Sequence, residues 1–147
     1  MTVAFATSEL TPIAKVGGLG DVAGALPKAL AHLGVDVCVI MPHYDTIDAK
    51  KYPITDTGKT ISVRAQKKDY VVKIHQTVIP GGEVPVYLLE NTDFLTGGGV
   101  YFEKSAMVNS FQEIERFLFF SMAVLPALSA LGIEPDILHC QDWHTGM

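Results

Sequence analysis

A glycine-rich stretch near the amino terminus carries the first chemical signal in the sequence. Lys15 is followed by Gly17, Gly18 and Gly20, and Asp21 comes directly after them. Glycines let main-chain N–H groups approach a ligand closely, and a helix that begins there adds the positive end of its dipole. Together with the charge of Lys15, these groups predict a site for a phosphate or a sugar phosphate. A solvent-facing lysine before a turn that merely packs a helix explains these residues equally well when they are taken alone.

The same stretch matches the G-x-G-x-x-G/A dinucleotide fingerprint from Gly18 to Ala23. Its surroundings differ from those of a nicotinamide or flavin site in two ways. The fingerprint normally follows the first strand at once, whereas a loop of about ten residues intervenes here. An acidic residue should also end the second strand to bind a ribose hydroxyl, but Asp36 stands at that strand's start. A dinucleotide-dependent oxidoreductase is therefore a minor alternative.

A second group of polar residues follows the apolar run 137–140 near the other end of the chain. Ligands of open α/β sheets bind just past the carboxyl ends of the strands, which is where this group lies. His139, Asp142 and His144 could be metal ligands, but they straddle a strand end, so groups that line a ligand site fit better. Trp143 is the only tryptophan, and its indole could stack on a sugar ring or pack in the core.

The spacing of apolar residues predicts the elements that position these groups. Residues 3–7 read as a buried strand, and Val22, Leu26 and Leu30 form an apolar stripe on a helix that ends before Gly34. Residues 35–41 are almost continuously apolar, as in a strand covered on both faces. This strand, helix, strand order predicts a parallel sheet with a right-handed crossover.

The rest of the chain predicts a hairpin and a second layer of helix. Residues 43–59 read as a loop, and residues 61–66 and 70–79 as two strands of a hairpin. Further strands are expected at 84–89 and 137–140. Between them, a long buried helix from about residue 110 to 131 places these apolar side chains on one side: Phe111, Ile114, Leu118, Met122 and Leu125. The pattern indicates an α/β fold with a mostly parallel sheet and a β-hairpin insertion.

Composition limits the class of protein. A chain of 147 residues that is 48% hydrophobic is long enough for one domain. Its net charge of -5 without a clustered basic face argues against a nucleic-acid partner. Two cysteines indicate a reducing compartment, and no leader segment is recognised, so we expect a cytoplasmic location. Residues 117–133 lack charge, but Pro126, Gly132 and acidic flanks favour a buried helix over a membrane span.

Four motifs, in order, closely resemble bacterial glycogen synthases and plant starch synthases. They lie at residues 8–30, 39–44, 115–121 and 135–146, so the resemblance spans the whole chain. It implies a Rossmann-like three-layer domain, the amino-terminal half of a GT-B fold. Residues 1–147 would then be an incomplete acceptor-side domain, and the carboxyl-terminal nucleotide-sugar domain would be absent from this chain.

The resemblance also implies an activity. Members of this family transfer glucose from ADP-glucose, or UDP-glucose, to the non-reducing end of an α-1,4-glucan with retention of configuration. The implied enzyme is a hexosyltransferase of glycogen or starch biosynthesis that needs no metal or other cofactor and has no membrane or nucleic-acid partner. It would be cytoplasmic, or in the plastid stroma if it were a processed plant protein. A non-catalytic glucan-binding Rossmann module is the alternative.

Roles of individual residues follow from matching positions in the motifs. The resemblance implies donor binding by Lys15, Gly17 and Gly18. It implies acceptor or sugar binding by Glu9 and Trp143. It implies catalytic roles for Asp21, Asp142 and His144.

The sequence departs from the family pattern in two places. Gln141 replaces a histidine usual before Asp-Trp-His, and Gln112-Glu113 stands where many members have Asp-Asn. The family's diphosphate clamp, its carboxyl-domain acidic residue and its nucleoside pocket all lie outside this sequence. We therefore expect that these 147 residues alone do not synthesise glucan.

Overall fold

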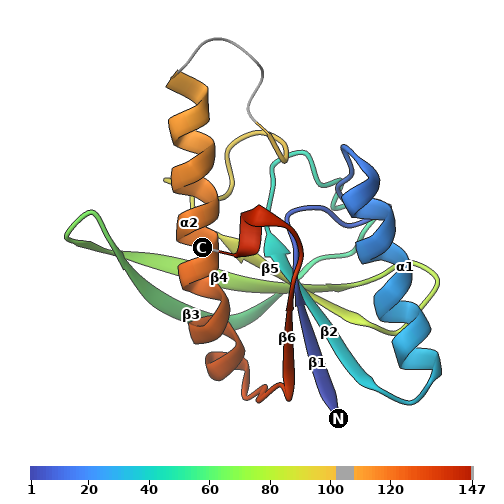
Figure 1. The fold of residues 1–147 in the computed structure, drawn as a ribbon. Helices are drawn as coiled ribbons and strands as arrows, with labels where there is room; N and C mark the ends of the chain where they lie inside the picture. Colours follow the sequence, from blue (N-terminus) through green and yellow to red (C-terminus); the bar gives the residue numbers. More distant parts are fainter. Residues whose placement is uncertain (102–107, 147) are drawn as a thin grey trace.

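A mixed sheet of six strands, with a helix on each face, forms the three layers of the molecule (Figure 1). The computed structural model describes residues 1–101 and 108–146. The strands lie in the order β3-β4-β5-β2-β1-β6. Their bounds are β1 Thr2–Ala6, β2 Asp36–Pro42, β3 Thr55–Ala65, β4 Lys68–Val78, β5 Pro85–Glu90 and β6 Ile137–Cys140. The helices are α1 Gly18–His32, α2 Val108–Leu131 and a short 3-10 helix η1 Trp143–Thr145.

The central strands are parallel and are covered on both faces. β1 pairs in parallel with β2 and with β6, and β2 pairs in parallel with β5. Because side chains alternate along a strand, Val3 and Phe5 join the core beneath α1, whereas Ala4 and Ala6 join the core beneath α2. The α/β fold with a mostly parallel sheet and a hairpin is thereby confirmed, as is the position of Asp36 at the amino edge of β2, opposite Thr2.

The hairpin of β3 and β4 lies beyond β5 and is antiparallel. Its two-residue turn holds Gln66 and Lys67 at φ 48° and 63°, the left-handed values that tight hairpin turns need. The sequence interpretation of residues 43–59 as a loop is wrong from Thr55 onward. Thr55 and Asp56 pair with β4, and the ladder shifts register before Lys59. This part of an edge strand is polar and exposed, so it has no apolar alternation by which the sequence could reveal it.

Helix α1 packs on the sheet through small residues. Its buried positions are Gly20, Ala23, Gly24 and Pro27, which repeat at i, i+3, i+4 and i+7. The predicted stripe is therefore wrong at Val22, which is half exposed, while Leu26 and Leu30 are only partly buried at its margin. The buried side of α1 carries small residues because the loop before α1 runs directly beneath the helix and leaves no room for larger side chains.

Helix α2 turns its predicted apolar side outward. The five residues expected on the buried side are all exposed: Phe111, Ile114, Leu118, Met122 and Leu125. The residues that pack on the sheet are instead Phe119, Phe120, Ala123, Val124, Ala127 and Leu128. Both sides of the helix are apolar, so periodicity alone could not choose between them. By length and composition α2 could cross a membrane, but its inner side belongs to the domain core, as expected of a buried helix.

Gly24 provides a test of the packing of α1. A Cβ at this position would lie 2.5 Å from the main-chain oxygen of Thr11, which has no freedom to move aside. We expect Gly24→Ala to lower the free energy of unfolding by about 1–3 kcal/mol, as overpacking usually does. Urea denaturation followed by circular dichroism measures this change.

The matched control is Gly18→Ala in the same helix, where a Cβ meets nothing within 4 Å. This variant should be as stable as the wild type or slightly more so, because alanine favours helix. Equal stability of Gly24→Ala and the wild type would show that the loop and helix can separate without cost.

Candidate functional site

The site lies at the carboxyl ends of β1 and β6. These strands are adjacent, with Ala6 opposite Cys140, so the loops that follow them leave the same edge of the sheet. The loop after β1 carries Glu9 and the glycine stretch, and the loop after β6 carries Asp142 and the short helix η1 (Figure 1). The sheet thus brings together two sets of polar residues that are far apart in sequence.

Glu9 organises the glycine loop. Its carboxylate is only 3% exposed, and Oε2 accepts hydrogen bonds from the N–H groups of Val16 at 2.8 Å and Gly17 at 2.7 Å. The Gly17 amide therefore points at a carboxylate of the same chain. Gly17 is also the N-cap of α1 and supplies no side-chain cap, so the first turn of α1, beginning at Gly18, retains the character of an anion site.

Lys15 lies beside this helix terminus and pairs with Asp21. Lys15 Nζ donates to both carboxylate oxygens of Asp21, at 2.6 and 2.8 Å, and Thr11 Oγ1 donates to Oδ1 at 3.1 Å. The hydrogen bond from Lys15, and next the one from Thr11, lower the pKa of Asp21. Asp21 therefore stays ionised and holds the ammonium group, which is nearly half exposed, at the mouth of the glycine loop.

Tyr101 connects the two halves of the site. Its hydroxyl lies 3.4 Å from Glu9 Oε1 and 2.8 Å from His144 Nε2. In this arrangement the N–H at His144 Nε2 donates a hydrogen bond to the Tyr101 oxygen, and the Tyr101 hydroxyl donates a hydrogen bond to Glu9 Oε1. Burial and the charge of Glu9 raise the pKa of Tyr101 to about 12, so its hydroxyl keeps its proton. Sequence reasoning missed Tyr101, because nothing in the spacing around it distinguishes it from other loop tyrosines.

His144 is buried among aromatic rings. Its imidazole packs edge-on against Phe117, with ring centroids 4.6 Å apart, and lies 4.2 Å from the Trp143 ring. Burial lowers its pKa, and this effect outweighs the opposing charges of Asp142 and Glu9. The imidazole is therefore neutral at neutral pH, and can accept one hydrogen bond and donate another.

Asp142 and Trp143 form the exposed part of the site. Asp142 has a φ of 64°, and its side chain accepts a hydrogen bond from the Trp143 N–H at 2.7 Å. Trp143 is 45% exposed, and its ring makes a T-shaped contact with Phe117. A partly exposed indole thus lies beside a carboxylate, a combination that suits a sugar ring.

The three residues that the sequence offers as possible metal ligands, His139, Asp142 and His144, do not bring their donor atoms together. His139 instead stacks on Phe5 with a centroid distance of 4.6 Å. Among the described residues, the only His, Cys, Asp and Glu side chains close enough to share an ion lie elsewhere, on β4, β5 and the end of β2.

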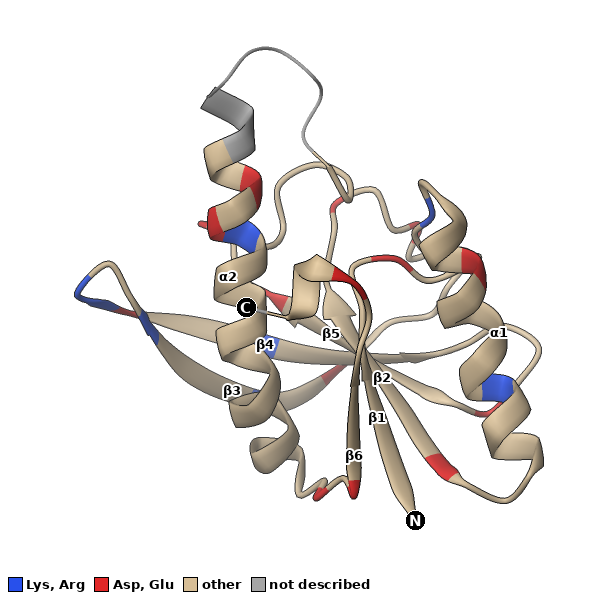
Figure 2. Cartoon of the chain, in the orientation of Figure 1, with Lys and Arg blue, Asp and Glu red and all other residues tan. Residues whose placement is uncertain are grey.

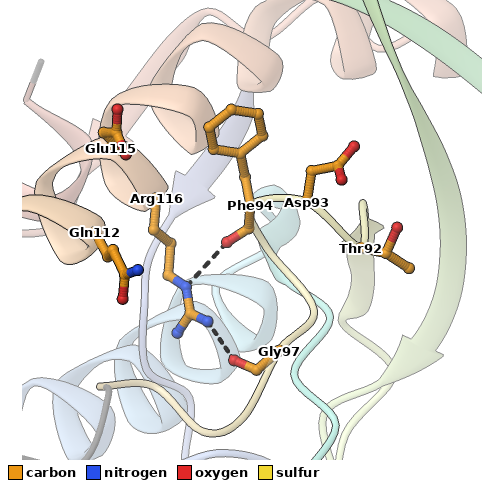
Figure 3. Close-up of a pocket in the computed structure, with 7 residues that line it drawn as sticks. All are labelled: Thr92, Asp93, Phe94, Gly97, Gln112, Glu115 and Arg116. Atoms are coloured by element: carbon orange, nitrogen blue, oxygen red, sulfur yellow. Dashed lines mark hydrogen bonds between the residues drawn. The ribbon is translucent and has the colours of Figure 1, made fainter. Parts of the chain in front are cut away.

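Arg116 of α2 fixes the loop that leads to Tyr101 (Figure 3). Its side chain is 1% exposed and donates to the main-chain oxygens of Phe94 at 3.1 Å and Gly99 at 2.7 Å, and also to that of Gly97. Burial lowers the pKa of this guanidinium from its usual value. A hollow of about 270 Å³ lies beside it, lined by Thr92, Asp93, Phe94, Gly97, Gln112 and Glu115.

Charge is unevenly distributed around the site. Glu9, Asp142 and Glu113 all act on Tyr101 through their charges. Lysine and arginine residues are spread over the hairpin, α1 and α2, and in this view they do not gather on one face (Figure 2). The polar wall at the ends of β1 and β6 is therefore acidic, and Lys15 is the cation at its edge.

Comparison with known proteins identifies the family of the chain. The family model of the starch synthase catalytic domain matches residues 2–147. The chain belongs to this family. Members of the starch synthase family with similar sequences include the glycogen synthases of Thermosipho africanus and Bacillus licheniformis, each 41% identical over the whole chain. The chain spans about three tenths of the length of these relatives, 30% and 28% respectively.

A solved structure shows the same fold. The catalytic domain of starch synthase IV from Arabidopsis thaliana, bound to ADP and acarbose, superposes with a TM-score of 0.81 at 35% identity. The match covers 98% of this chain and 28% of that chain. The Rossmann-like architecture expected of a starch synthase family member is thereby confirmed.

Arg116 provides a test of how the site is held. Arg116→Met removes a buried cation that bonds several carbonyls, so we expect the free energy of unfolding to fall by roughly 2–4 kcal/mol. The control is Arg64→Met, because Arg64 is exposed and only reaches Asp69 at 3.5 Å. That change should cost no more than about 1 kcal/mol. Equal losses in the two variants, measured by urea denaturation, would contradict the role of Arg116.

The burial of His144 predicts a dependence of stability on pH. Its pKa is lowered in the folded state, so the unfolded chain binds the proton more readily once the pH falls below the ordinary value of 6.5. Stability contributed by the neutral imidazole is present above that pH and is lost as the pH falls toward the folded value. Urea denaturation at pH 7.5 and 5.5 should show a smaller acid loss for His144→Gln than for the wild type. The exposed His32→Gln is the control, and equal losses in all three proteins would refute the prediction.

Proposed function

We propose that this chain is the amino-terminal, acceptor-side part of a glucan synthase, which transfers glucose from ADP-glucose to the non-reducing end of an α-1,4-glucan with retention of configuration. The observation that carries the proposal is the meeting of Lys15 and the amino terminus of α1 with the chain Glu9, Tyr101 and His144 at one sheet edge. A cation and helix dipole suit a diphosphate, and the acidic and imidazole groups suit sugar hydroxyls.

The donor side of the proposal rests on charge. When the bond between glucose and its nucleoside diphosphate breaks, negative charge grows on the leaving phosphate. Groups already oriented toward that position stabilise the transition state more than the ground state. Lys15 is held in place by Asp21, and it can exchange one carboxylate oxygen for a phosphate oxygen without a change of position. We assign Lys15 and Gly18, at the start of α1, to donor binding on this basis. Gly17 is assigned with them from its place in the motif, because its own N–H donates to Glu9 Oε2.

The acceptor side rests on the groups around His144. The neutral imidazole, the Asp142 carboxylate and the exposed Trp143 face line one wall, with Glu9 behind them. Their donors and acceptors match the hydroxyl groups of a glucan, and the indole matches the apolar face of its ring. We assign Asp142 and His144 to the reaction and Glu9 and Trp143 to sugar binding. Asp21 is assigned to the reaction from its place in the motif and through its hold on Lys15.

The choice of ADP-glucose over UDP-glucose is supported by the starch synthase IV structure, which was solved with ADP and acarbose. The nucleotide-sugar domain expected from the family would supply the base contacts and the opposite wall of the cleft. We propose that residues 1–147 act with such a domain rather than alone.

Lys15→Ala tests the donor role in a polypeptide that carries this sequence together with its nucleotide-sugar domain. Loss of one preorganised group at the developing charge should lower kcat by roughly 10²–10³-fold and raise KM for ADP-glucose. Incorporation of labelled glucose from ADP-glucose into glycogen measures both constants. KM for glycogen should change little, because Lys15 lies on the donor side.

The matched control is Lys50→Ala, which removes an exposed lysine from the loop after β2 and should leave both constants unchanged. Unchanged donor kinetics in Lys15→Ala would refute the donor role. Absence of any glucosyl transfer by the wild-type polypeptide would instead refute the synthase proposal and favour a glucan-binding module.

A further inference from the structure

Three side chains outside the site converge where the parallel and antiparallel parts of the sheet meet. His43 follows β2, His75 lies in β4, and Glu90 ends β5. These strands are neighbours, since β5 pairs with β2 on one side and with β4 on the other. In the register His75 lies opposite Leu88, two residues before Glu90 on the same face of β5.

Their donor atoms are close together. Glu90 Oε2 lies 2.7 Å from His75 Nε2 and 3.6 Å from His43 Nδ1, and the ligand atoms of all three residues lie within 4.8 Å of one another. The side chains are only 14–24% exposed. Within the described residues, His43 Nδ1 and His75 Nε2 are buried nitrogens that both approach Glu90 Oε2 without meeting hydrogen-bond geometry. A cation between the three groups would accept an electron pair from each nitrogen and from the carboxylate oxygen.

We propose that His43, His75 and Glu90 form a binding site for a divalent transition metal of the zinc class. Two imidazoles and one carboxylate are a donor set that zinc takes, with a fourth position left for water. Zinc ligands at about 2.0–2.1 Å place tetrahedral donor atoms about 3.3–3.4 Å apart. The observed separations bracket that value, so shifts of about 1 Å or less in the side chains would complete the geometry.

The neighbouring lysine, Lys73, does not compete with a metal for Glu90 Oε2. Lys73, opposite Glu90 in the ladder, approaches the other oxygen, Oε1, at 3.6 Å. It is more than half exposed, so it can swing toward solvent when a cation binds. A monodentate contact through Oε2 is therefore compatible with this neighbour. Imidazole and carboxylate together favour zinc over magnesium or calcium, which prefer sites made of oxygen alone.

The place of the site in the fold indicates its role. A metal bound there joins the end of β2 to β5 and to the hairpin strand β4, which otherwise meet through main-chain ladders. It would hold the hairpin to the parallel core. The cluster shares no residue with the group of Glu9, Tyr101 and His144, so the proposed glucosyl transfer does not require the metal, and the two proposals can fail separately.

Isothermal titration of the purified protein with zinc chloride tests the site. We expect one zinc ion per chain, with an affinity that falls at least about tenfold in His75→Gln and in Glu90→Gln. His32→Gln, which removes an exposed histidine at the end of α1, should bind zinc as the wild type does. The melting temperature of the wild type should rise with zinc, because the ion binds the folded chain.

A measurement on the wild type alone tests the site even if the variants fail to fold. The imidazole nitrogen resonances of His43 and His75 should shift on addition of one equivalent of zinc, while those of His32, His139 and His144 stay in place. Absence of zinc binding, or equal binding by His75→Gln and the wild type, would overturn the proposal and leave an ion-paired cluster only. Shifts confined to the other histidines would overturn it as well.

Discussion

The buried carboxylate of Glu9 is the constraint on which the rest of the site depends. Removing an ionised group from water costs several kcal/mol unless it is fully hydrogen-bonded. Two amide donors from the glycine loop and the Tyr101 hydroxyl satisfy it here. Because the loop must fold around this carboxylate, the start of α1 and the position of Lys15 are set by it as well. One charge therefore fixes both the glycine loop with Lys15 and the contact to Tyr101.

Arg116 plays the complementary part from the opposite layer. Its guanidinium donates hydrogen bonds to main-chain oxygens of the loop, and this loop places the Tyr101 hydroxyl beside Glu9 and His144. The site is thus connected to α2 through the bonds of Arg116 to loop carbonyls and through Phe117, which packs against His144. A displacement of α2 would therefore be transmitted to Tyr101 and to His144.

Sequence reasoning was strongest where periodicity is strict. Most strands, the hairpin and both helices could be predicted, and the ordered motifs placed the candidate residues at one sheet edge. It failed for the outward side of α2 and the position of Val22 on α1, because hydrophobicity does not say which of two apolar sides the sheet will bury. Tyr101 and Arg116 owe their importance to contacts across the fold, and the cluster of His43, His75 and Glu90 exists only through sheet register.

The strand order has a further consequence for how the molecule reaches its folded state. β1 lies between β2 and β6, so its second edge stays unpaired until residues more than a hundred positions later arrive. Contacts of such long range are slow to form, since a large loop must close before any pairing offsets its entropy. The unit of β1, α1 and β2 can associate early, because its contacts join residues close in sequence. The pairing that unites Glu9 with His144 belongs to the last steps of assembly, so the site is completed only when the fold is.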